Sequence, residues 1–142
     1  MFSCLLRSRH WLKSESGGAL LEAALVLPMI LVVIMGVARF GLTFNNYITL
    51  HNAVRSGTRE LAISRAPGQN ACTIGEARLR SAAPSLVQAS LLVTPTVTTS
   101  CTELKIGSDA TLTATYPCNL EILGINFAPN CVLTAKTTER VE

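Results

Sequence analysis

Residues 23–38 form an apolar run without a charged residue, and a single carboxylate, Glu22, stands directly before it. A helix needs about 20 apolar residues to cross the hydrocarbon core of a bilayer. The run alone is slightly short, so we expect the membrane-spanning part to cover about residues 20–44, with Glu22 and Arg39 near its two ends. A chain of 142 residues then has room for one further small domain.

Basic side chains precede this run, which predicts the orientation of the chain. Arg7, Arg9 and Lys13 lie before the span with one acid, Glu15. Positive charge on the amino-terminal side predicts a cytoplasmic N-terminus, with the rest of the chain translocated across the membrane to the periplasm or the exterior. Without those four residues, 9 basic and 8 acidic groups remain, and this balance gives no reason to expect nucleic-acid binding.

A cleavable secretory signal is the main alternative for the apolar run. Its hydrophobic part would be shorter and would end in small residues of the Ala-x-Ala kind. Here the run ends in Gly36, Val37, Ala38, Arg39 and Phe40, which is a poor site for a conventional signal peptidase.

The helical pattern continues beyond the membrane segment. Apolar residues recur at steps of three and four, at Phe40, Phe44, Tyr47, Ile48, Val54 and Leu61. One helix over residues 18–66 is the simplest interpretation, ending at the Pro67–Gly68 pair. Pro28 either bends this helix or takes part in packing against neighbouring helices.

Residues 67–142 have the pattern of a small α+β domain. The spacing of Thr73 and Glu76 suits a capping box and predicts a short helix over 74–83. Apolar residues alternate with threonines over 91–99, 110–116 and 131–141, which predicts three half-buried strands with Pro95 at a sheet edge or a bulge. We expect a small antiparallel sheet of about three strands packed against the long helix.

Four cysteines lie in the exported part, at Cys72, Cys101, Cys118 and Cys131. An even number in an oxidising compartment predicts two disulfides. We expect Cys118 to pair with Cys131 because they flank the connection between adjacent strands. Cys72 would pair with Cys101, which ties the short helix to the end of the first strand. Zinc binding is the alternative, but the four cysteines form no close Cys-x-x-Cys pairs, so we expect no metal.

Residues for catalysis are scarce. His10 in the leader and His51 on the long helix are the two histidines of the chain, and no nucleophile–base set or phosphate-binding glycine loop stands out. We therefore expect neither enzymatic activity nor a cofactor.

A basic leader, a glycine, an acid five residues further and an apolar helix together resemble a type IV-like prepilin, and most closely the TadE-like family of minor pseudopilins of the tight-adherence (Flp-type) pilus. The residues that carry this resemblance are Gly17–Gly18–Ala19–Leu20–Leu21–Glu22 with the following residues to Pro28, then 36–41, then 51–62.

The resemblance implies cleavage by a prepilin peptidase on the cytoplasmic side. A cut after Gly17 removes residues 1–17, makes Gly18 the first residue and places Glu22 fifth. The sequence departs from the type IV pattern in having two adjacent glycines and a glycine as the first mature residue. A cut after Gly18 would leave Glu22 in fourth place.

Physical reasoning also suggests a role for Glu22, as the partner of a positive charge. A carboxylate among apolar helices is tolerated when a cation meets it, and the new N-terminal amine of a neighbouring subunit is such a cation. Alternatively, Glu22 lies at the level of the lipid headgroups.

Two functions follow from these observations. The first is a pilin-like subunit whose partners are the inner membrane, the prepilin peptidase, other pilin or pseudopilin subunits and the assembly platform. The second is an unprocessed, single-pass envelope module that interacts with other components and never enters a fibre. An exported enzyme with a conventional signal would require cleavage near Ala38.

Overall fold

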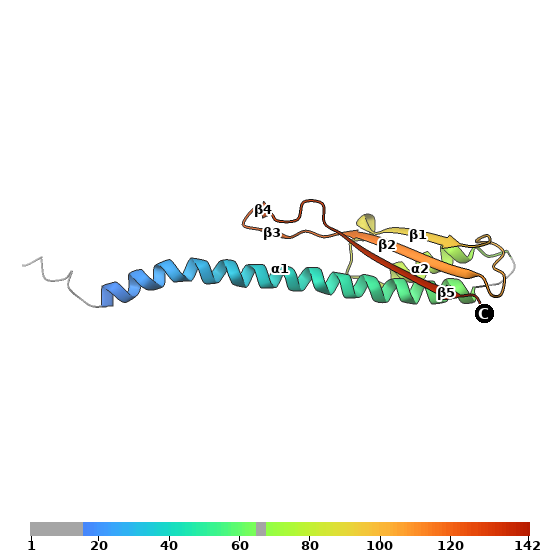
Figure 1. The fold of residues 1–142 in the computed structure, drawn as a ribbon, viewed down its shortest axis with the longest axis horizontal. Coiled ribbons are helices and arrows are strands. Elements are labelled where there is room, and N and C mark those ends of the chain that lie inside the picture. Colours follow the sequence, from blue (N-terminus) through green and yellow to red (C-terminus); the bar gives the residue numbers. More distant parts are fainter. Residues whose placement is uncertain (1–15, 65–67) are drawn as a thin grey trace, which may run out of the picture. The chain divides into compact units, whose positions relative to one another are not determined.

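The computed structural model describes residues 16–64 and 68–142, and within them the chain has the α+β architecture predicted from sequence (Figure 1). The leader, with Arg7, Arg9, His10, Lys13 and Cys4, lies outside the described residues, and so does the predicted helix end at Ala66 and Pro67. The elements are α1 (Ser16–Ile63), α2 (Ala71–Ala82), η1 (Gln88–Ser90), β1 (Leu92–Val97), β2 (Asp109–Pro117), β3 (Glu121–Ile122), β4 (Ile125–Asn126) and β5 (Val132–Arg140).

The chain divides into two compact units, and the boundary falls inside α1, between Ala38 and Arg39. In the first unit, α1 is long and apolar enough to cross a membrane, with a mean hydropathy of 2.6 over its most apolar window. Side chains there are exposed almost throughout, as expected for a helix whose surroundings are lipid or other subunits. Within the described residues, this helix is the one candidate for a membrane anchor, by its length and composition.

In the second unit, the carboxyl half of α1 forms one side of the domain core. Its buried residues recur at steps of three and four: Leu50, Ala53, Val54, Gly57, Thr58, Leu61 and Ala62. Phe40, Phe44, Tyr47 and Ile48, which belong to the apolar pattern seen in the sequence, are exposed instead. The apolar residues of α1 up to Ile48 are therefore exposed on the helix surface, whereas those between Leu50 and Ala62 face the core of the second unit.

Helices α1 and α2 meet at two glycines. A Cβ placed on Gly57 would lie 2.7 Å from the backbone oxygen of Gly75, and one placed on Gly75 would lie 2.7 Å from the Cβ of Leu61. No side chain fits at either position without moving backbone atoms. The missing side chains therefore allow the two helix backbones to pack directly against each other.

The start of α2 differs from the predicted capping box. The N-cap is Asn70, whose Oδ1 accepts hydrogen bonds from the backbone N–H groups of Cys72 (3.1 Å) and Thr73 (3.4 Å). Thr73 lies inside the helix and donates its hydroxyl to the Asn70 carbonyl, while Glu76 pairs with Arg80 at 2.8 Å. The prediction of Thr73 as cap was wrong because Asn70 satisfies the first free donors three residues earlier.

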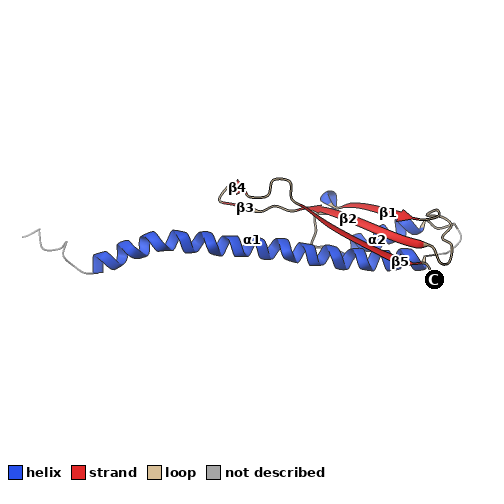
Figure 2. Cartoon of the chain, viewed as in Figure 1, coloured by secondary structure: helices blue, strands red, loops and turns tan. Residues whose placement is uncertain are grey.

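Three strands form an antiparallel sheet in the order β1-β2-β5 (Figure 2). The inward side chains of the central strand, Ala110, Leu112 and Ala114, are fully buried, and Ala135 of β5 continues this face. Threonines line the other face, where the hydroxyls of Thr111 and Thr138 lie 2.8 Å apart across β2 and β5. These features confirm the predicted alternation, and Pro95 lies on an edge strand as its missing donor requires.

The connection between β2 and β5 contains a small hairpin of β3 and β4 that the sequence pattern did not indicate. Leu123 and Gly124 form its turn, with φ of 52° and 80°. Two successive positive φ values favour Asn, Asp or Gly at the first position. Leucine there costs about 1–2 kcal/mol relative to a right-handed conformation, so the turn itself does not explain Leu123.

Candidate functional site

The amino-terminal turns of α1 hold the residues to which the sequence analysis assigned a function. Glu22 lies four residues after Gly18, which places the two one helical turn apart on the same face. Its side chain is exposed, and it is the one ionisable residue between Ser16 and Ala38. Within residues 16–64 and 68–142 the single ion pair is Glu76–Arg80, so that part of the chain supplies no cation for Glu22.

Gly17 and Gly18 lie inside α1 with no packing reason for their lack of a side chain. A Cβ added to either would meet nothing within 4 Å in the described structure. They are the second and third residues of the helix and belong to its first turn. Packing within the described residues therefore does not account for either glycine.

Pro28 lies within α1, and the helix continues through it. Its missing N–H leaves the carbonyl of Ala24 without its usual intrahelical donor. Both residues are exposed, so packing within the described part of the first unit does not account for the proline.

Arg39 and His51 lie on the exposed surface of α1 in the second unit. His51 faces Tyr47, with ring centroids 6.0 Å apart, as expected for a residue that packs on the helix surface.

A groove of about 390 Å³ lies where the end of α1 meets the last residues of the chain. The sequence analysis did not find it, because its members come from two distant segments. Its lining residues are Arg55, Arg59, Ala62, Ile63, Glu139, Arg140 and Glu142. This set contains guanidinium groups and carboxylates but neither a hydroxyl or thiol nucleophile nor a histidine, so it offers no nucleophile–base pair.

Four cysteines of the second unit form two disulfides, Cys72–Cys101 and Cys118–Cys131. These are the two pairs predicted from the sequence. The first joins α2 to the connection between β1 and β2, and the second closes the connection between β2 and β5. Among the described residues, no group of three or more His, Cys, Asp and Glu side chains is arranged to hold a metal ion.

Residues 17–59 match the family described as TadE-like protein. The matched segment lies within α1 and contains Gly17, Gly18, Glu22 and Pro28, and it ends before α2 and the sheet. The family resemblance predicted from sequence is thus confirmed over these residues. No curated protein and no solved structure matches the chain.

Proposed function

We propose, from the premise that residues 17–59 match the TadE-like family, that this membrane-anchored chain is a minor pilin-like subunit, a pseudopilin. TadE-like proteins are structural and associated with the tight-adherence pilus. The subunit takes part in assembling that pilus or a related secretion apparatus. The observation that carries the proposal is Glu22, the one charge on the exposed apolar helix between Ser16 and Ala38.

Processing prepares the helix for assembly. A prepilin peptidase cuts after Gly17 on the cytoplasmic side, which frees an amine on Gly18. The two glycines meet the steric demand of that peptidase, which agrees with their lack of any packing contact in the described structure. The domain of residues 67–142 then lies in the periplasm or on the surface fibre.

Assembly uses the carboxylate of Glu22 as a partner for the new amine of a neighbouring subunit. Both charges are poorly solvated in an apolar layer, and each compensates the other there. Because the pairing joins fixed positions on two helices, it sets their axial stagger. Pro28 contributes an unpaired carbonyl at Ala24 that a neighbouring helix can satisfy.

The proposal is tested with Glu22→Ala and Glu22→Gln, compared at equal membrane levels. Glu22→Ala leaves a buried amine without its partner, a change that commonly costs about 3–5 kcal/mol, so its incorporation into the pilus should be strongly reduced. Glu22→Gln still accepts a hydrogen bond and should do milder harm. Glu60→Ala, which removes a carboxylate from the same helix outside the apolar run, is the matched control and should assemble normally.

Incorporation is measured by co-purification with sheared surface fibres and with the assembly platform. Insertion and the folded domain should be unaffected in every variant. Normal incorporation of Glu22→Ala would show that the carboxylate is tolerated at the headgroup level and has no role in assembly.

Leader processing distinguishes this function from that of a permanently anchored envelope module. We expect mass spectrometry of the membrane-extracted protein to show a chain beginning at Gly18, and Gly17→Ala to retain the leader. An intact Met1 in the wild type would favour the anchored module. A start near Phe40 would indicate a conventional signal peptide instead.

A further inference from the structure

The loop of residues 118–131 is an ordered segment with an apolar surface. The Cys118–Cys131 disulfide closes it, and the Phe127 N–H donates to the Leu120 carbonyl at 3.1 Å. The Ala128 N–H donates to Oδ1 of Asn126 at 2.9 Å. Although its backbone is fixed in this way, the loop exposes Leu123 (67%), Ile125 (62%) and Phe127 (66%).

Leu123 is an unusual residue for its position in this loop. It occupies the tip of the β3–β4 hairpin with a left-handed backbone, where Asn or Gly would be favoured. It is also exposed, so burial in the domain does not compensate for the unfavourable conformation. A large apolar side chain kept at a strained, exposed tip indicates an external contact.

The loop lies at the end of the second unit where this unit's part of α1 begins, after Ala38. The groove described above places the carboxyl end of β5 beside Arg59 and Ile63 at the end of α1. From there β5 runs back along α1 for nine residues, about 30 Å. In α1 the same length corresponds to about 20 residues, so the loop lies toward the end of this unit at which its part of α1 begins, away from Ile63 (Figure 1).

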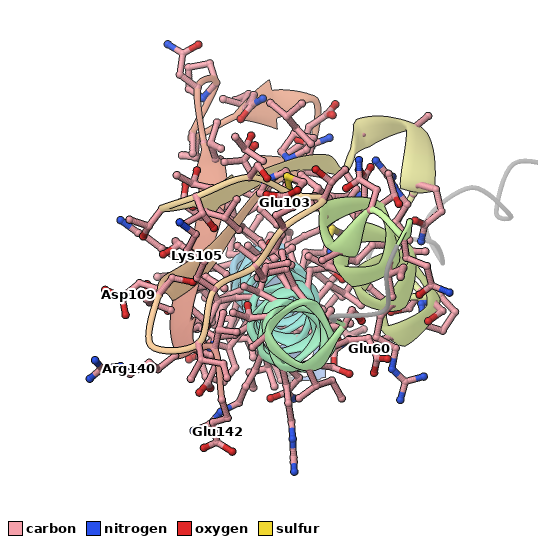
Figure 3. All side chains as sticks on the ribbon, turned by 90° about the vertical axis from the view of Figure 1, so that its right-hand side faces the viewer. Glu60, Glu103, Lys105, Asp109, Arg140 and Glu142 are labelled. Carbon is pink, nitrogen blue, oxygen red and sulfur yellow. A yellow bond between two sulfur atoms is a disulfide. The ribbon has the colours of Figure 1, made fainter. Side chains whose placement is uncertain are left out.

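Charged residues gather at the opposite end of this unit. Figure 3 looks onto that end and shows Glu60, Glu103, Lys105, Asp109, Arg140 and Glu142 around the end of α1. By contrast, the loop contains a single charged residue, Glu121. The second unit therefore has one charged end and one apolar end. The apolar end is the one at which this unit's part of α1 begins, directly after the uncharged residues 23–38.

We propose that residues 118–131 dock on the lipid bilayer, with Leu123, Ile125 and Phe127 inserted among the headgroups on the exported side. Three exposed apolar side chains on a loop closed by a disulfide match the amphipathic boundary of a membrane. The docking orients the domain on the membrane surface before the subunit leaves it. It requires the membrane anchor but not pilus assembly, so it can fail independently of the proposed function.

The test uses tryptophan fluorescence of the full chain in phosphatidylcholine vesicles. Trp11, the one tryptophan of the chain, is replaced by phenylalanine, and Phe127→Trp reports from the loop. Ile106→Trp in the same background is the matched control, because Ile106 is 76% exposed in the connection between β1 and β2. We expect brominated phosphatidylcholine to remove about half of the Phe127→Trp emission and little of the control emission.

Adding Leu123→Asn and Ile125→Thr to the Phe127→Trp chain should abolish most of this quenching. Asparagine suits the left-handed turn and threonine suits the strand, so the fold is preserved. Emission quenched by aqueous acrylamide but not by brominated lipid would overturn the proposal. Shielding from both quenchers that grows with the protein-to-lipid ratio would also overturn it, because a second copy of the chain would then cover the loop.

Discussion

A single side chain, Asn70, fixes where α2 begins. It satisfies two backbone donors of the first turn, and the Ala71 N–H donates to the Cys101 carbonyl at 2.8 Å. The cap thus holds the helix start beside the Cys72–Cys101 disulfide. Thr73, although a favourable capping residue by type, has no capping role because it already lies inside the helix.

The two candidate caps can be separated by mutation. We expect Asn70→Ala to lower the free energy of unfolding by about 1 kcal/mol, since two donors lose their acceptor. Thr73→Ala should change it by less than about 0.5 kcal/mol, because this position is exposed. Thermal unfolding of the full chain in detergent, followed by circular dichroism, measures both. A larger loss for Thr73→Ala would restore the capping box.

At the scale of elements, the contact between α1 and α2 depends on the two glycines that face each other. We expect Gly57→Ala to destabilise the domain by a net of about 1–3 kcal/mol, because its methyl group would overlap Gly75, Leu79 and Leu112. The helix preference of alanine offsets only about 1 kcal/mol.

Gly41→Ala is the matched control for this prediction. It makes the same substitution in the same helix, where a Cβ meets nothing within 4 Å. Its stability should be unchanged or slightly raised, as judged by the same unfolding measurement. Equal effects of the two substitutions would contradict direct backbone packing at Gly57.

At the scale of the whole molecule, the two disulfides stabilise different parts of the second unit. Cys72 is buried in the core, and its pair with Cys101 closes a segment of 29 residues. Replacing both by serine should lower the free energy of unfolding by about 3–4 kcal/mol. Replacing Cys118 and Cys131 should mainly open residues 119–130, because their loop lies outside the core.

Limited proteolysis and thermal unfolding together distinguish these effects. Without Cys118–Cys131, cleavage should occur in the loop while the melting temperature of the core changes little. Non-reducing peptide mapping of the wild type should recover the two disulfide pairs. A link between Cys72 and Cys118 would contradict this arrangement.

Much of the fold was determined by short-range sequence patterns. The apolar run preceded by Glu22 predicted the membrane helix, and the alternation around Leu112 predicted a half-buried strand. These patterns are reliable because helices and strands repeat with fixed periods, so burial on one side leaves a regular trace in the sequence. The predicted helix and strands also pointed to the disulfide pairs, because Cys118 and Cys131 flank the connection between two of the strands.

Other features were decided by contacts between distant segments. Gly57 reads in the sequence as an unfavourable helix residue, and only the approach of α2 explains it. Strands β3 and β4 have two residues each, which is too short for a period to appear. The groove unites Arg55 with Glu139, which are far apart in the chain. The sequence by itself thus determined the elements that repeat, while the tertiary structure decided where their surfaces meet, because such contacts depend on residues with no regular spacing along the chain.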